Sequence, residues 1–145
     1  MLDGVRAALG DQASVPFQPG CEDGPACADT SGFDDAVAAA RGAAATVLLL
    51  GTRGTGGDGC TPRSCEDEGA DRASIRLPEA QYTLATRLAG AAPRLVCVLV
   101  HGGTLELGSL LRDCDAILSA GFPGAQGALS QPEGCSDGSG CAACA

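Results

Sequence analysis

Aromatic and basic side chains are both scarce in this chain of 145 residues. It has no tryptophan, one tyrosine and three phenylalanines, so any platform that stacks on sugars or bases is thin. Nine Lys and Arg residues face eighteen Asp and Glu residues, which gives a formal net charge of −9. Nucleic acids and anionic membranes are bound by clustered basic side chains, so the charge argues against both partners.

Long apolar runs are also missing. No run approaches the ~20 residues that span a bilayer. The opening stretch, MLDGVRAALGDQ, lacks a basic region followed by a long apolar segment, so we expect no secretory signal peptide in this chain. The hydrophobic content of 45% and charged content of 19% are typical of a globular protein, and the length fits one domain.

Cysteine, in contrast, is abundant, and the total of nine is odd. Cys21 and Cys27 bracket one short loop, and Cys60 and Cys65 bracket another. Either pair can form a disulfide in an oxidising compartment. Cys97 lies within the apolar run RLVCVLV, so we expect it to be a buried free thiol.

Apolar runs that alternate with helical patterns predict an α/β fold with a mostly parallel sheet. The runs are continuous rather than alternating, which favours strands buried on both faces and therefore a three-layer sandwich with helices on both faces. Ser31 lies three positions before Asp34, the spacing of a capping box. The expected helices lie within 2–10, 30–45 and 78–91, and the expected strands within 46–51, 94–100 and 115–124.

The last residues differ in character from the rest of the chain. From 128 to 145 the sequence is small, polar and rich in cysteine, without hydrophobic periodicity, and we interpret it as a disordered low-complexity tail. The folded domain is then 1–127. Cys135, Cys141 and Cys144 in the tail fall short of the four ligands of a structural zinc site, so no metal site is expected.

Two short motifs match known patterns without the structural context that those patterns need. GTGGDG, residues Gly54–Gly59, fits GxGxxG, but it continues into an acidic segment instead of a helix that would hold a pyrophosphate. A flexible loop is favoured, no cofactor is expected, and a nucleotide-binding domain is kept as an alternative. GCSDG at 134–138 fits GxSxG without a strand before it, and we expect His101 to be a loop histidine at a strand end.

The acidic stretch CEDEGADR, residues 65–72, follows the predicted strand 46–51 and a glycine-rich loop. In parallel sheets, ligands bind beyond the carboxyl ends of the strands. Most acidic loops are merely solvated. Glu66 and Glu68 flank Asp67, however, and repulsion between neighbouring carboxylates can raise a pKa enough for general acid catalysis.

Several stretches between Leu2 and about Gly127 together carry a family pattern. EDEGADRASIRLPEAQ fits E-x-E-x-x-D-R followed by Leu-Pro and a helix with Gln, and DAILSAGFPGAQG fits DAIL-x-x-G-[YF]-P-G-x-x-G. The other stretches are LDGVRAALG, QPGCEDGPAC, SGFDDAVAAARGAAATVLLLG and VLVHGGTLEL. In this order they resemble the C-terminal α/β-sandwich domain of glycoside hydrolase family 3, in its plant and algal β-xylosidase and β-glucosidase branch.

The resemblance implies retaining hydrolysis of β-linked xylo- or gluco-oligosaccharides by two carboxylates. In the family, an Asp on an N-terminal TIM barrel is the nucleophile, and a Glu on a loop of the sandwich domain is the acid/base. Carried onto this chain, the acid/base is Glu66, with Glu68 as the alternate. Asp71 and Arg72 match the Asp-Arg pair of the pattern, which implies a brace of the loop or a part of the substrate loop. Full-length members are expected outside the cell or in the cell wall.

The chain also departs from the family pattern. The barrel is missing, the loop RGTGGDGCTPRSC is longer than in close relatives, and the tail replaces the usual continuation after residue 127. We therefore expect a fragment of a glycosidase that is inactive without a barrel. The alternative is a non-catalytic carbohydrate-binding or interaction module.

Overall fold

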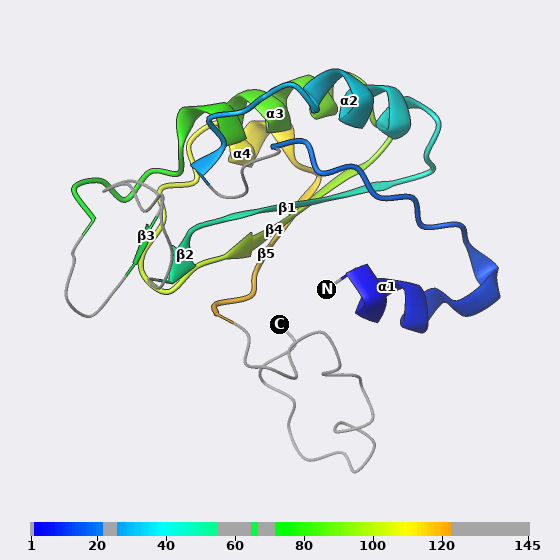
Figure 1. Cartoon of the computed structure of the whole chain (residues 1–145), viewed down its shortest axis with the longest axis horizontal. Helices are drawn as coiled ribbons and strands as arrows, with labels where there is room; N and C mark the ends of the chain where they lie inside the picture. Colours follow the sequence, from blue (N-terminus) through cyan, green and yellow to red (C-terminus); the bar gives the residue numbers. More distant parts are fainter. Residues whose placement is uncertain (1, 22–25, 55–64, 67–71, 123–145) are drawn as a thin grey trace, which may run out of the picture. The chain divides into compact units, whose positions relative to one another are not determined.

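The computed structural model describes residues 2–21, 26–54, 65–66 and 72–122 (Figure 1). For residues 53–54 and 65–66, only the backbone is described. The predicted boundary at residue 127 and the predicted tail lie outside these residues. Along the chain the elements are α1 (Leu2–Leu9), the 3-10 helix η1 (Gly10–Gln12), α2 (Phe33–Arg41), β1 (Thr46–Gly51), β2 (Arg53–Gly54), β3 (Cys65–Glu66), α3 (Glu79–Ala89), β4 (Leu95–Val100), α4 (Leu110–Asp113) and β5 (Ala116–Ser119).

The described residues belong to two compact units, 2–17 and Gln18–Phe122. In the first unit, α1 ends at Leu9 and Gly10 follows with a φ of 51°, a conformation that glycine adopts without strain. The Arg6 guanidinium donates hydrogen bonds to the Val15 carbonyl at 3.0 and 3.3 Å, which turns the following chain back along the helix. The predicted first helix is therefore confirmed.

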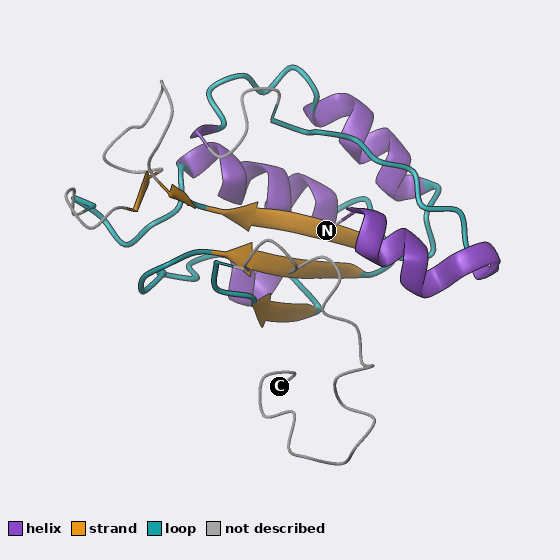
Figure 2. Cartoon of the chain, turned by 60° about the horizontal axis from the view of Figure 1, so that its bottom comes forward, coloured by secondary structure: helices purple, strands orange, loops and turns teal. Residues whose placement is uncertain are grey.

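The second unit is built on a parallel sheet in the order β1-β4-β5, which confirms the α/β class (Figures 1 and 2). Leu48 pairs with Cys97, and Cys97 pairs with Ile117, so these three side chains share one face. Parallel neighbours need a crossover, and α3 provides it between β1 and β4 while α4 provides it between β4 and β5.

The two faces of this sheet differ. On the helix-covered face, Leu95, Cys97 and Leu99 are at most 1% exposed. On the other face, Val47 and Leu118 are about half exposed. The layer formed by α2 and α3 lies along one side of the sheet (Figures 1 and 2), and α4 packs against α3. Within the described part of this unit, β1 and β5 thus differ from the expected burial on both faces, because no second layer of helices is found there.

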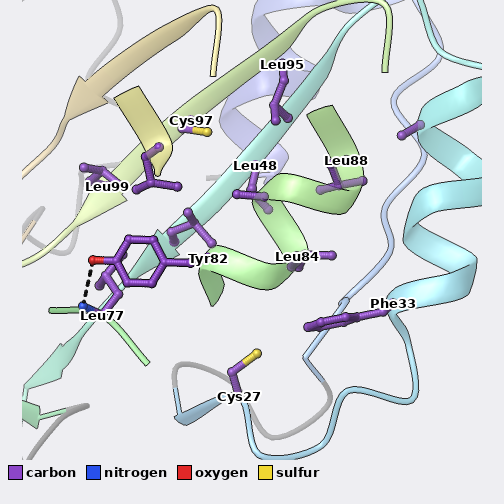
Figure 3. Packing of buried hydrophobic residues seen from close by; sticks show 14 of the residues in the cluster. Cys27, Phe33, Leu48, Leu77, Tyr82, Leu84, Leu88, Leu95, Cys97 and Leu99 are labelled. Carbon is purple, nitrogen blue, oxygen red and sulfur yellow. Dashed lines mark hydrogen bonds between the residues drawn. The ribbon is translucent and has the colours of Figure 1, made fainter. Parts of the chain in front are cut away.

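Helix α3 is the centre of the hydrophobic core. Its Leu84, Ala85 and Leu88 are at most 3% exposed and belong to the core cluster that also includes residues of β1 and β4 (Figure 3). Burial of one leucine side chain contributes about 1.5–3 kcal/mol. The other buried apolar residues of this core are Cys27, Phe33, Val37, Ala40, Leu48, Leu50, Leu77, Tyr82, Leu95, Cys97, Leu99 and Leu110.

Helix α2 begins differently from the expected capping box. Its N-cap is Gly32, which has no side-chain cap, and the helix starts at Phe33. The Ser31 amide donates instead to the Asp29 carboxylate at 3.0 Å. This hydrogen bond lowers the pKa of Asp29, since it favours the charged form. The capping-box prediction is wrong because Asp29 forms a local turn with Ser31 before the helix begins.

Two disulfides join described residues of the second unit. Cys21 is bonded to Cys27, with 4.9 Å between their Cα atoms. Cys97 is bonded to Cys114 across 6.0 Å, so the prediction of a free thiol is wrong. Cys114 directly follows α4, and the chain reverses direction after β4 so that Cys114 comes close to Cys97. The sequence around Cys97 gives no sign of this contact. The proposed pairing of Cys60 with Cys65 lies outside the described side chains.

Candidate functional site

The acidic stretch 65–72, called the acid segment below, is attached to the carboxyl end of β1. After Gly51 and Thr52, β2 pairs in parallel with β3, and this pairing places the backbone of Glu66 beside Gly54. Glu66 thus begins its loop just beyond the end of a parallel strand, where such sheets bind ligands. Glu68 and Asp71 lie outside the described residues.

The backbone is tightly packed where the chain leaves β1. A Cβ atom at Gly51 would lie 2.0 Å from the Val100 carbonyl oxygen, so no side chain fits there. Beside it, the Gln81 side chain accepts a hydrogen bond from the Gly51 amide and donates one to the Gly51 carbonyl, both at 2.9 Å. The Thr52 amide then donates to Val100 at 2.9 Å. These bonds fix the direction in which the chain leaves β1.

The far end of the acid segment is held by Arg72. Its guanidinium donates a hydrogen bond of 2.7 Å to the Thr104 carbonyl, in the loop that follows β4. Arginine presents several donors in a rigid plane, which suits it to hold a backbone turn. The role of Asp71 and Arg72 as a brace of the loop stays a prediction.

Tyr82 joins the segment after Arg72 to the same loop. Its hydroxyl donates to the Glu106 carbonyl at 2.5 Å and accepts a hydrogen bond from the Leu77 amide at 3.2 Å (Figure 3). The Arg76 guanidinium lies over the Tyr82 ring, 5.1 Å from its centre. A buried tyrosine hydroxyl normally needs such partners, and here they tie two loops to helix α3.

Charge pairs on the surface add to this connection. Arg76 is 3.2 Å from the Glu79 carboxylate and 3.8 Å from that of Glu106, and its backbone forms an isolated parallel bridge with Glu106. All three side chains are largely exposed, so each ion pair stabilises the loops only slightly. The backbone bridge and Tyr82 therefore carry most of the link.

A small open hollow of about 110 Å³ lies beside this link, lined by Ser74, Arg76, Leu77 and Glu79. Pockets that enclose small ligands usually measure about 300–1,000 Å³. This hollow alone is therefore too small to surround a sugar. Within the ranges that the structure describes, no three His, Cys, Asp or Glu side chains gather as metal ligands. No helix among these residues is long and apolar enough to cross a membrane.

Gln81 and Tyr82 were not predicted as functional residues. Both lie on the buried side of α3, where a polar group must find a hydrogen-bond partner. This adjacent polar pair on an otherwise apolar helix face is the available sequence signal. Neither the partner loops nor the distances could be read from it.

These observations define a parallel α/β domain that holds the two ends of an acid segment at the carboxyl edge of its sheet. Residues 1–130 match the glycosyl hydrolase family 3 C-terminal domain. The chain belongs to this family.

Xylosidases are among the proteins similar to the chain. It is 39% identical over 118 residues to Beta-D-xylosidase 1 of Arabidopsis thaliana, covering 79% of this chain and 14% of that protein. Beta-D-xylosidase 3 of the same plant is 34% identical over 125 residues, with 84% and 15% covered. Beta-xylosidase of Formosa agariphila is 25% identical over 124 residues, with 86% and 16% covered. The chain therefore spans only about a seventh of these relatives.

Proposed function

We propose that this chain supplies the general acid/base of a retaining glycosidase that acts on β-linked xylosides or glucosides. Glu66 is the proposed acid/base and Glu68 its alternate. The main supporting observation is that the backbone of Glu66 lies beside Gly54, just beyond β1, in a member of a glycosidase family. Several similar proteins are named as xylosidases, which favours a xyloside as substrate.

In the proposed reaction, the protonated Glu66 carboxyl gives its proton to the glycosidic oxygen as the sugar leaves. An Asp of a family 3 barrel attacks the anomeric carbon and forms the covalent intermediate. The Glu66 carboxylate then takes a proton from water, which releases the sugar with retained configuration. The two tasks need two carboxylates on opposite sides of the bond, so a barrel domain is the proposed partner.

Contacts before the acid segment and at its end support this assignment. A displacement of about 1 Å can cost about 100-fold in rate, so an acid/base on a loop needs rigid attachment. Gln81 fixes the chain at Gly51 before the segment, and Arg72 bonds to Thr104 at its end. We propose that these are positioning residues for the carboxylate.

The test uses a chimera in which this chain replaces the matching segment of Arabidopsis Beta-D-xylosidase 1. Glu66→Gln should lower kcat/KM for xylobiose by about 10²–10⁴-fold. A dinitrophenyl xyloside needs no protonation to leave, so its first step should change little, and azide should restore turnover by replacing water. Glu68→Gln tests the alternate residue, and it should cost less than about tenfold when Glu66 is the acid/base. Equal activity of Glu66→Gln and the parent chimera on xylobiose would contradict the assignment.

The isolated chain makes a separate prediction. It should not hydrolyse an aryl β-xyloside or β-glucoside, since it lacks the nucleophile of the barrel. Measurable turnover by the purified chain would overturn the proposed division of labour. Tight binding of xylo-oligosaccharides without turnover would favour a sugar-binding module instead.

We also propose that the full-length protein works outside the cell or in the cell wall. The disulfides Cys21–Cys27 and Cys97–Cys114 support an oxidising compartment. Fractionation of cells that express a tagged full-length protein would test this. Recovery in the cytosol with these four thiols reduced would contradict it.

A further inference from the structure

A serine and the single histidine meet at the ends of β4 and β5. The Nε2 atom of His101 is 2.8 Å from the Ser119 hydroxyl oxygen. The Nδ1 atom of the same ring is 2.6 Å from the Gly103 carbonyl oxygen. The base is thus within hydrogen-bonding distance of both a nucleophile and a group that orients it, which is the arrangement of an activated serine.

The hydrogen-bond partners define the tautomer of the neutral ring. A carbonyl oxygen only accepts hydrogen bonds, so Nδ1 must carry the proton that faces Gly103. Nε2 is then left with its lone pair toward Ser119, and the serine hydroxyl must donate. This is the orientation that a general base needs to remove the serine proton.

The backbone holds the two side chains in register. Ser119 pairs with Leu99 in the sheet, and the amide of Ala120 donates to Leu99 at 2.9 Å. The amide of His101 donates to Gly121 at 3.3 Å. Ser119 itself is exposed, so an external molecule can reach its hydroxyl. The pair also lies at the carboxyl edge of the parallel sheet.

We propose that Ser119 and His101 form a nucleophile–base pair that reacts with esters of small carboxylic acids. This activity is independent of the carboxylates of the acid segment and goes beyond the proposed glycosidase role. The exposed position of Ser119 suits small, accessible acyl groups.

The reaction is an acyl transfer. The Ser119 oxygen attacks the ester carbonyl carbon while His101 Nε2 takes the hydroxyl proton, and a new O–C bond forms. The bond from carbon to the leaving oxygen breaks, and the alcohol departs with the proton held by His101. Water then repeats the attack on the acylated Ser119, gives its proton to Nε2, and releases the acid while the serine regains its hydrogen.

The test is covalent labelling of the full 145-residue chain with a fluorophosphonate probe, together with release of nitrophenol from p-nitrophenyl acetate. We expect the label on Ser119, assigned by fragmentation of the peptide in a mass spectrometer. This assignment needs no variant and does not depend on whether a substitution folds.

Variants then separate a reactive pair from a structural hydrogen bond. Ser119→Ala should abolish the label, and His101→Gln should slow labelling about 100-fold or more, because the base is lost. Ser31→Ala is the matched control and should label at the parent rate, since the sole histidine faces Ser119. Circular dichroism checks that each variant is folded. A label on other serines only, or an equal rate in folded His101→Gln, would overturn the proposal.

Discussion

The helix-covered face of the sheet and the carboxyl edge of the same sheet are held together in different ways. Buried apolar side chains such as Leu95 and Leu99 hold the covered face, supported by the Cys97–Cys114 disulfide. At the edge, Gln81 and Tyr82 hold the loops by a few hydrogen bonds to the backbone. The first region is stabilised by contact area, whereas the second depends on the geometry of individual polar groups.

This difference suits a domain whose core is a scaffold and whose edge presents the acid segment. Apolar burial is non-directional, so it stabilises the fold without positioning a loop accurately. Hydrogen bonds are directional, and each contributes little to the net free energy of unfolding. They therefore position the loop accurately but stabilise the fold only slightly. Substitutions in the two regions should therefore differ in size and kind.

The largest effect is expected from Leu95→Ala on the covered face. Leu95 is 1% exposed, and its truncation should lower the free energy of unfolding by about 2–5 kcal/mol through lost burial and a cavity. Val47→Ala on the other face of the sheet is the control, at about 0.5 kcal/mol, since Val47 is half exposed. Urea unfolding of both variants gives the two values. Equal losses would show that Val47 is covered in solution.

The next effect concerns the disulfides. Replacement of Cys97 and Cys114 together by alanine opens a loop of 17 residues and should cost about 3 kcal/mol. The matched change of Cys21 and Cys27 opens a loop of six and should cost about 2 kcal/mol. Thermal unfolding without reductant measures both. A larger loss at Cys21 and Cys27 would contradict the ranking by loop length.

At the carboxyl edge, Gln81→Leu should lower the free energy of unfolding by about 1–3 kcal/mol. It removes both partners of the Gly51 backbone, which is buried there. Thr83→Ala is the control on the exposed side of the same helix, where the hydroxyl only bonds to Glu79 one turn earlier. Urea unfolding and amide exchange at Gly51 measure the effect. Unchanged exchange at Gly51 would show that its contact with Gln81 does not persist in solution.

The smallest effect is expected from the charge of Asp113. Burial raises its pKa, but hydrogen bonds from Thr86 and Arg112 outweigh this, and the pKa is lowered overall. A lowered pKa in the folded state stabilises the fold above the unfolded value of about 3.9. That contribution disappears as the pH falls through the lowered pKa.

Asp113→Asn should therefore reduce the loss of melting temperature between about pH 6 and pH 3. The exposed Asp11→Asn is the matched change of charge. Thermal unfolding across this range measures the slopes. A steeper loss in Asp113→Asn than in the parent would mean that the sign of the pKa shift is wrong.

The α/β class and the strands were predictable because apolar runs such as TVLLLG are local signals of buried strands. Helix α3 was predictable too, as Pro78 precedes it and Leu84 and Leu88 share a face. The start of α2 was not predictable, because the Asp29 carboxylate accepts a hydrogen bond from the Ser31 amide, a backbone group that a capping box would also use. Short polar contacts of this kind are decided by small energies.

For the candidate site, the acidic pattern of CEDEGADR and its position after a strand were visible in the sequence. The contacts that hold the chain around it were not visible. Arg72 bonds to Thr104, 32 residues away, and Gln81 bonds to Gly51, 30 residues away. The pairing of Cys97 with Cys114 likewise required α4 to return over β4.

The sequence by itself determined the parallel α/β class, the apolar runs that form the strands, and the family to which the chain belongs. Hydrophobic periodicity and the order of the motifs are properties of the sequence itself, so they can be recognised without the tertiary structure. The tertiary structure alone decided which polar groups meet across the carboxyl edge, including His101 with Ser119. These contacts join residues far apart along the chain, and a hydrogen bond depends on tenths of an ångström that no local pattern specifies.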